Sequence, residues 1–297
     1  MNVGLDIGAT KTLGVVIDDA GEILAEVREA TEPGTDGVVR TAARVVEALR
    51  AATGAPLEDI VGVGIPGLVD HERAAVKHAV NLGLDGDWFG LGDLLGDRLG
   101  VRVVAENDVN AATLGAVAMS GEDDLVYVSI GTGLAAGLVL EGRLRRGDHG
   151  AAGEVGHIPV DPNGALCECG QRGCLETIAS GSALATAWPT SGQVPPAQAL
   201  FAAAQAGDRK AIELRDEFAA GVASAVRVLA LAADPRTVVL GGGVAQLGEQ
   251  LRVAVAAALS DQAATSPFLA SLDLAGRLRV VPSSYPVAAV GAALLGR

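Results

Sequence analysis

The chain has 297 residues, of which 49% are hydrophobic, and it carries 22 Lys and Arg against 36 Asp and Glu, a formal net charge of −14. Such a chain can fill one large or two ordinary hydrophobic cores. The acidic excess argues against a nucleic-acid partner, because affinity for nucleic acids rests largely on cations that neutralise phosphates. No basic segment followed by an apolar run opens the chain, and no long uncharged stretch predicts a membrane span. We therefore expect a cytoplasmic protein with no membrane partner.

The first hundred residues predict an α/β arrangement. The segment NVGLDIGATKTLGVVIDDAGEILAE reads as three strands joined by tight turns. Apolar residues recur at helical spacing over 36–52, which predicts an amphipathic helix. Strands are expected at 60–65, before Pro66-Gly67, and at 101–106, with Asn107 and Asp108 at the start of the next helix.

The opening hairpin recurs later in the chain. LVYVSIGTGLAAGLVLEGRL, at 125–144, aligns with the first segment at an offset of 123. The alignment pairs Ile7 with Ile130, Gly8 with Gly131, Gly14 with Gly137, and Val16 with Val139. Two unrelated hairpins with glycine turns are the alternative. A matched pair favours two α/β domains of common design, with ligand approaching the backbone at the glycines.

The second half is mostly helical, including a long helix over about 208–233. A buried strand is expected where TVVLGGGV runs into three glycines at 237–244, and another near LRVVPS. The last segment, VAAVGAALLG, predicts an apolar helix.

Three glycine loops each follow a predicted strand: DIGATK at 6–11, IGTG at 130–133 and LGGGV at 240–244. Glycines after a strand let backbone N–H groups point at phosphates, and Thr10, Lys11 and Thr132 could add donors. This combination favours a nucleoside triphosphate, although any one loop could be a simple turn. Neither GxxxxGK[ST] nor GxGxxG is present. Asp6 is either a turn residue or a carboxylate that holds Mg²⁺ through water.

The segment AENDVNAA places Asn107 and Asp108 where an apolar strand meets a helix. Either residue could simply cap that helix. If a sugar hydroxyl is the nucleophile, a carboxylate here can accept its proton while the neighbouring amide fixes the sugar.

All three cysteines, Cys167, Cys169 and Cys174, lie within eight positions of one another, with His157 ten residues upstream of the first. In a reducing compartment a metal site is the better explanation than a disulfide framework. Three thiols and one imidazole make a closed, structural zinc site. A neutral imidazole can bind zinc with one nitrogen and donate from the other. Glu154, in GEVGH, and Glu176, in GCLE, flank this segment.

These motifs, in this order, resemble the ROK (repressor, open reading frame, kinase) group of bacterial sugar kinases, within the actin, hexokinase and Hsp70 superfamily. DIGATK and IGTG look like the two phosphate motifs of the group, and ENDVNAA is similar to its catalytic segment. GIPG resembles its turn near the sugar, and LGGG its adenosine-side motif. GEVGH followed by CxCGxxGCxE resembles its zinc-containing signature, and the likeness spans essentially the whole chain.

The resemblance implies an α/β fold of two actin-like (ribonuclease H-like) domains with a ligand cleft between them. The smaller domain would comprise 1–106 and about 286–297, and the larger 107–285 with the zinc loop. It further implies phosphorylation of a hexose 6-hydroxyl by ATP with Mg²⁺, a structural Zn²⁺, and a homodimer or homotetramer. Asp108 would be the general base. The implied sugar-binding residues are Gly67, Asn107, Asp108, Glu154, His157 and Glu176. The implied nucleotide-binding residues are Asp6, Gly8, Thr10, Lys11, Thr132, Gly133, Gly242 and Gly243. The implied zinc ligands are His157, Cys167, Cys169 and Cys174.

The chain departs from the group at two places. Ala9 stands where members usually have glycine, and Ala135 and Ala136 follow IGTG where a glycine-rich run is common. Because alanine adds a methyl group and disfavours positive φ, the approach of phosphate could be tighter or the nucleotide affinity lower.

Glucose is the expected substrate, with N-acetylmannosamine or N-acetylglucosamine as the alternatives and polyphosphate as an alternative donor. A non-catalytic sugar-binding regulator is a further alternative. A sugar-responsive repressor is disfavoured, because such members carry a DNA-binding domain before the first phosphate motif, whereas five residues precede Asp6 here.

Overall fold

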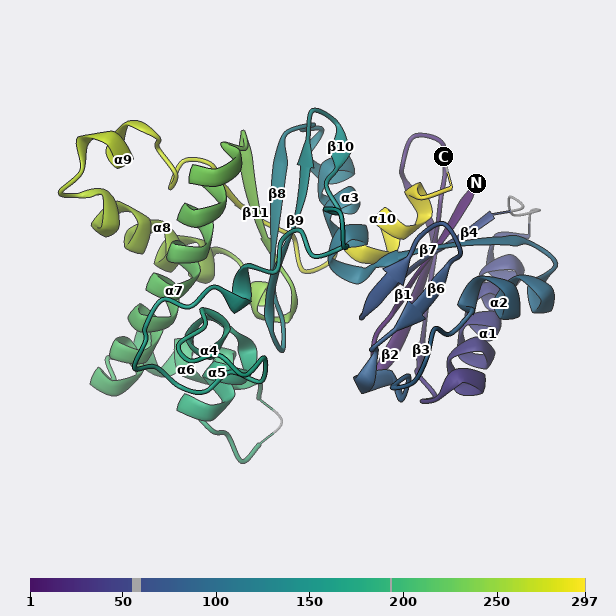
Figure 1. The fold of residues 1–297 in the computed structure, drawn as a ribbon, viewed down its shortest axis with the longest axis horizontal. Coiled ribbons are helices and arrows are strands. Elements are labelled where there is room, and N and C mark those ends of the chain that lie inside the picture. The colour runs from purple at the N-terminus through teal and green to yellow at the C-terminus, as the bar shows by residue number, and fades with distance from the viewer. Residues whose placement is uncertain (55–59, 193, 297) are drawn as a thin grey trace. The chain divides into compact units, whose positions relative to one another are not determined.

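The computed structural model describes residues 1–54, 60–192 and 194–296 (Figure 1). They form two compact units, each with a hydrophobic core of its own. Unit 1 comprises Met1–Gly121, Arg146–Gly150 and Pro286–Arg297, and unit 2 comprises Glu122–Arg145 and Ala151–Tyr285. Within the described residues, no helix combines the length and the apolar character needed to cross a lipid bilayer.

Unit 1 is built on a five-stranded sheet in the order β3-β2-β1-β4-β7. Strands β1, β2 and β3 form an antiparallel meander, whereas β1, β4 and β7 are parallel. The strands of this sheet are β1 (Asn2–Ile7), β2 (Lys11–Ile17), β3 (Ile23–Ala30), β4 (Ile60–Ile65) and β7 (Arg102–Asn107). The other elements of the unit are α1 (Thr35–Thr53), β5 (Leu68–Asp70), β6 (Ala75–Lys77), η1 (Val80–Leu82), α2 (Leu91–Leu99), α3 (Asp108–Ser120) and α10 (Val287–Leu294).

Helices cover both faces of the unit 1 sheet, because successive side chains of a strand point to opposite faces. On one face, a Cβ at Gly4 of β1 would meet α10. On the other face, the side chain of the next residue, Leu5, lies near Val45 of α1. Helix α1 buries the apolar stripe that its sequence predicts, from Val38 to Leu49. The sequence-predicted helix and strands of this half are thus confirmed.

Helix α3 belongs to unit 1 because it packs closely on α10. A Cβ at Gly291 of α10 would overlap the carbonyl oxygen of Ala111 in α3, so only glycine permits this approach. The unit therefore extends to Gly121, beyond the division after residue 106 that we expected. The short excursion Arg146–Gly150 also belongs to it.

Unit 2 repeats the sheet of unit 1 in the order β10-β9-β8-β11-β12. Strands β8, β9 and β10 are antiparallel neighbours, and β8, β11 and β12 are parallel. This common topology confirms that the repeated glycine hairpins are two copies of one design. Their registers differ by one residue: Ile7 pairs with Thr12 in the first copy and Ile130 with Leu134 in the second. The second turn is therefore one residue shorter.

Helices of unit 2 pack on one face of its sheet, where Val126, Val128 and Leu240 share a core with Phe218 and Val222 of α7. The strands of this sheet are β8 (Leu125–Ile130), β9 (Leu134–Leu140), β10 (Arg143–Leu144), β11 (Thr237–Gly241) and β12 (Leu278–Val280). The other elements are η2 (Val155–His157), α4 (Glu176–Ala179), α5 (Gly181–Ala187), α6 (Pro196–Gln205), α7 (Arg209–Ala233), η3 (Gly243–Leu247), α8 (Glu249–Ala263) and α9 (Pro267–Ser271).

Candidate active site

In unit 1 the expected site residues gather at one edge of the sheet. Strands β1, β4 and β7 run parallel, so their carboxyl ends meet at the same edge. Asp6 lies opposite Gly64 in the ladder, and Asn107 lies opposite Ile65, two residues before Gly67. In open α/β sheets, ligands bind beyond this edge of the strands.

Asp6 and Asp108 interact electrostatically. Burial is the larger cause and the negative charge of Asp108 the smaller one; together, and against the opposing effect of Lys11, they raise the pKa of Asp6 from 3.8 to about 6. The site therefore holds two carboxylates close enough for the charge of one to affect the protonation of the other.

Asn107 is the N-cap of α3, so the capping interpretation is confirmed. Its Oδ1 accepts hydrogen bonds from the backbone N–H of Val109 at 3.0 Å and of Asn110 at 3.3 Å. Its Nδ2 donates to the carbonyl oxygen of Gly67 at 3.1 Å. Among the residues that the structure describes, the second amide hydrogen of Asn107 has no acceptor, so it can serve a ligand. Asp108 follows as the first residue of the helix, where the helix dipole favours a negative charge.

Glu106 is a further residue of this site; the sequence shows it just before Asn107 and Asp108 but indicates no role for it. It is 2% exposed, and Oε1 accepts from the backbone N–H of Asn107 and from Nδ2 of Asn110. Its Oε2 accepts from Nε of Arg146 at 2.6 Å. The available signal is a glutamate at the end of the mostly apolar strand VRVVAE. The partner lies 40 residues away in the sequence and could not be paired with it from the sequence alone.

The alanines that depart from the family pattern sit without backbone strain. Ala9 is an exposed turn residue between Gly8, whose N–H donates to the Lys11 carbonyl, and Thr10. Ala135 and Ala136 pair with strand β8 inside β9. None of the three adopts a positive φ.

In unit 2 the two glycine motifs meet at one edge of the sheet, because β8 and β11 are parallel. Gly242 has a φ of 82°, and a Cβ there would crowd the backbone of Ile130, where β8 ends. The N–H of Gly242 donates to the Tyr127 hydroxyl at 3.1 Å. Gly243 is different, since a Cβ on it would meet open space. The arrangement brings Thr132 and Gly133 to the same edge as Gly242 and Gly243.

Glu176 begins α4 and reaches the turn that contains Gly133. Its Oε2 accepts a hydrogen bond from the backbone N–H of Leu134 at 2.9 Å. The resemblance implies that Glu176 binds sugar hydroxyls, and it does not indicate this bond to the turn.

His157, Cys167, Cys169 and Cys174 converge in unit 2, with all four candidate ligand atoms within 4.8 Å of one another. Cys167 Sγ lies 3.7 Å from His157 Nδ1, and Cys169 Sγ lies 3.6 Å from Cys174 Sγ. A tetrahedral zinc with Zn–S bonds of about 2.3 Å places its sulfur ligands about 3.8 Å apart. The donor set and its spacing therefore fit structural zinc, and the cluster predicted from the sequence is brought together.

A glutamine supports this cluster from outside. Gln171 Nε2 donates to the carbonyl of His157 at 3.0 Å and to Cys169 Sγ at 3.4 Å. The donated hydrogen bond lowers the pKa of Cys169, whereas burial raises that of Cys174. The sequence alone indicates no role for Gln171, because a glutamine is not a usual zinc ligand.

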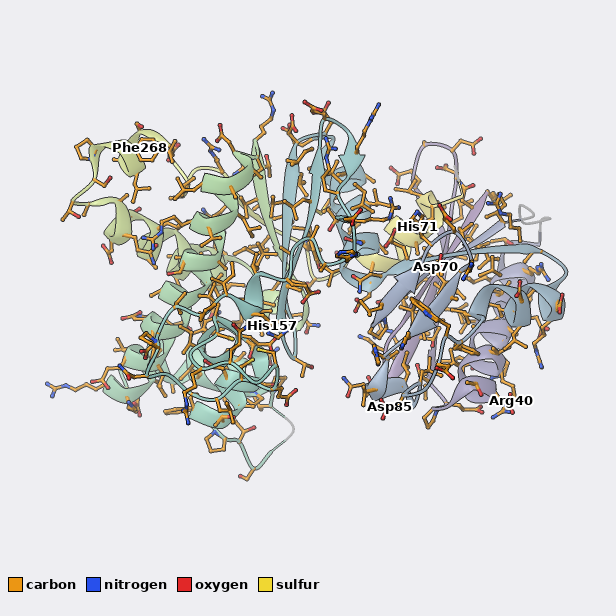
Figure 2. The ribbon with its side chains drawn as sticks, in the orientation of Figure 1. Arg40, Asp70, His71, Asp85, His157 and Phe268 are labelled. Atoms are coloured by element: carbon orange, nitrogen blue, oxygen red, sulfur yellow. The ribbon has the colours of Figure 1, made fainter. Side chains whose placement is uncertain are left out.

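The two nitrogens of His157 face different neighbours. Nδ1 is turned to the thiol of Cys167, and Nε2 lies 3.9 Å from Oε2 of Glu154. Figure 2 labels His157, which ends η2 just ahead of the cysteine segment. With Nδ1 on a metal, Nε2 would carry the proton and remain available as a donor on the side of Glu154.

Residues 2–295 match the ROK family. The chain is 36% identical to a glucokinase of Thermotoga maritima over 272 residues, covering 84% of both chains. It is 32% identical to an N-acetylmannosamine kinase of Yersinia pseudotuberculosis, covering 82% of both. A ROK family glucokinase of Streptomyces griseus, solved with glucose and AMPPNP, superposes with a TM-score of 0.80 at 32% identity, covering 99% of this chain and 98% of that one. The chain belongs to the ROK family.

Proposed function

We propose that this protein is an ATP-dependent hexose kinase that phosphorylates the 6-hydroxyl of glucose. The observation that carries the proposal is Asp108, held at the first position of α3 beside Asp6, at the carboxyl edge of the unit 1 sheet. The similarity to the T. maritima and S. griseus glucokinases supports glucose as the acceptor and ATP as the donor.

Asp108 acts as the general base. As the 6-hydroxyl oxygen forms its bond to the γ-phosphorus, its proton passes to the Asp108 carboxylate. The bond between the γ-phosphorus and the bridging oxygen breaks, and ADP leaves with that electron pair. Asp6 is placed to hold a water of the Mg²⁺ that accompanies ATP, and the ion would neutralise phosphate charge.

The residues divide by task. We assign sugar hydroxyls to Gly67, Asn107, Glu154, His157 and Glu176. We assign phosphates to Thr10, Lys11, Thr132 and Gly133, and the nucleoside to Gly242 and Gly243. Gly8 belongs to the same nucleotide-binding set. His157 and the three cysteines would hold the zinc, which would give the loop a rigid frame.

N-acetylmannosamine is the second candidate substrate, favoured by the 32% identity to the Y. pseudotuberculosis enzyme. That identity is close to the one shared with the glucokinases, so overall similarity does not separate the two sugars. N-acetylglucosamine belongs in the same test.

A coupled assay for ADP formation with MgATP decides between them, using glucose, mannose, fructose, N-acetylmannosamine and N-acetylglucosamine. We expect the largest kcat/KM for glucose, and no turnover of any sugar would refute the proposal. Asp108→Asn should lower kcat by about 10²–10⁴-fold with the glucose Kd little changed. Full activity in that variant would remove Asp108 from the role of base.

A further inference from the structure

The turn between β8 and β9, residues 131–134, is held from outside by the segment that follows the cysteines. The N–H of Gly181 donates to the carbonyl of Gly131 at 2.8 Å, and that of Ser182 to the carbonyl of Thr132 at 3.2 Å. Glu176 holds the other end, because its Oε2 accepts from the N–H of Leu134. Residues 176–182 therefore hold this turn, which we call the phosphate turn, by three hydrogen bonds.

These hydrogen bonds determine which backbone N–H groups of the phosphate turn remain available to a ligand. The N–H of Gly131 is used within the turn, on the carbonyl of Gly133, and that of Leu134 is used by Glu176. In the described part of the chain, the N–H groups of Thr132 and Gly133 have no acceptor. Two consecutive backbone donors at a turn form an anion-binding concavity.

Glu176 also explains the glycine at position 133. A Cβ on Gly133 would overlap Oε2 of Glu176, so any side chain there must displace the carboxylate. The other carboxylate oxygen, Oε1, makes no hydrogen bond or ion pair with the residues that the structure describes. One oxygen is thus committed to the turn and the other is available to a ligand.

We propose that Glu176 is a positioning residue for nucleotide binding as well as a sugar ligand. Its Oε2 fixes the phosphate turn so that the Thr132 and Gly133 N–H groups face the nucleotide phosphates, while Oε1 accepts from a sugar hydroxyl. This inference rests on the proposed kinase function. It goes beyond that function in one respect: one side chain sets the affinity for both substrates.

The two tasks of Glu176 have different chemical requirements, so substitutions separate them. A glutamine keeps an oxygen that can accept from the Leu134 N–H and keeps the length of the side chain. It removes the negative charge that strengthens a hydrogen bond from a sugar hydroxyl. Alanine removes both functions.

The test measures MgADP binding by calorimetry in the absence of sugar, and glucose binding separately. We expect Glu176→Gln to bind MgADP within about twofold of the wild type and glucose about tenfold more weakly. Glu176→Ala should lose about tenfold in affinity for both ligands. Glu217→Ala, which removes an exposed glutamate of α7 in the same unit, is the matched control and should change neither Kd.

A double-mutant cycle tests the contact itself. Gly133→Ala should weaken MgADP binding because its methyl group displaces the Glu176 carboxylate. In Gly133→Ala/Glu176→Ala that clash is gone, so the loss should be smaller than the product of the two single losses. Losses that multiply, or a Glu176→Ala protein with unchanged MgADP affinity, would overturn the proposal.

Hydrogen exchange of the Leu134 amide in the ligand-free protein provides a second measure. Exchange should be faster in Glu176→Ala than in the wild type and unchanged in Glu176→Gln. Equal rates in the wild type and both variants would contradict the hydrogen bond from the Leu134 N–H to Glu176. A wild-type protein that binds MgADP but phosphorylates no sugar would refute the kinase function alone. One that binds no MgADP would refute both.

Discussion

Nε of Arg146 lies 2.6 Å from Oε2 of Glu106, and this ion pair joins the excursion 146–150 to the end of β7. The glutamate side chain is 3% exposed and the arginine side chain 34%. Through Oε1, Glu106 also holds the N–H of Asn107, so the pair supports the backbone that carries Asp108. Arg146 is therefore expected to affect both stability and catalysis.

Replacing Arg146 by Met leaves the buried carboxylate of Glu106 without its cation. Such a change typically costs several kcal/mol, and we expect a fall in the free energy of unfolding of about 2–4 kcal/mol. Urea unfolding measures it, and kcat for the preferred sugar should fall as well. Arg145→Met is the matched control, because Arg145 pairs with the exposed Glu141 and should cost less than about 1 kcal/mol. Equal stability of the two variants would argue against a structural role for the Glu106 pair.

Asp6 makes stability depend on pH in a defined direction. Its pKa is raised from 3.8 to about 6 in the folded state, so between these values the folded protein holds a proton that the unfolded chain releases. The free energy of unfolding therefore falls as pH rises through this window. Asp6→Asn removes the charged form and should be more stable than wild type at pH 7, by up to about 3 kcal/mol.

The same substitution should abolish most of the kinase activity while raising the melting temperature, a trade that is common at functional sites. In the wild type, activity should fall as pH drops through about 6, because Asp6 then takes up a proton. Thermal melts at pH 7 and pH 3.5 check the stability effect, which should vanish at the lower pH. An Asp6→Asn protein less stable than wild type at pH 7 would contradict the burial argument.

Zinc should be present at about one atom per chain in the purified protein, as measured by atomic absorption. Cys174→Ser removes a fully buried ligand, and we expect loss of the metal together with a lower melting temperature. Ser260→Ala, at an exposed position of α8, is a control that should keep the full metal content. A Cys174→Ser protein with undiminished zinc would exclude this cluster as the site.

Gly242 and Gly243 are neighbours that should respond differently to alanine. Gly242 has positive φ and its Cβ would crowd Ile130, so Gly242→Ala should lower the free energy of unfolding by about 1–3 kcal/mol. Gly243 has open space around its Cβ, so Gly243→Ala should fold normally. If the nucleoside lies against Gly243, that variant should still bind MgADP more weakly. Denaturant unfolding and calorimetry together separate the two effects, and an unstable Gly243→Ala protein would contradict the structure.

Local sequence patterns predicted most secondary structure. The helical stripe of α1, the apolar strand β4 and the paired glycine hairpins all appear where the patterns placed them, because periodicity and turn residues act over a few neighbouring positions. The cysteine cluster could also be predicted, since its ligands lie close in the chain and zinc accepts few donor sets.

The boundary between the two units was harder to predict from the sequence. Residues 108–120 continue from β7 in sequence, and nothing local shows which unit they join. Helix α3 joins unit 1 because it packs on α10, which is distant in the sequence; Gly291 of α10 contacts Ala111 of α3. Packing of this kind depends on which surfaces fit, and that information is spread along the chain.

The sequence by itself determined the family pattern, the α/β alternation, the donor set for zinc and the identities of the acidic residues. Only the tertiary structure decided which polar atoms are already used: Glu106 by Arg146, Asn107 by its own helix and Gly67, and one oxygen of Glu176 by the phosphate turn. The physical reason is that a buried polar group must find a partner, and its partner is chosen by proximity in space. Those commitments determine which atoms remain for substrate.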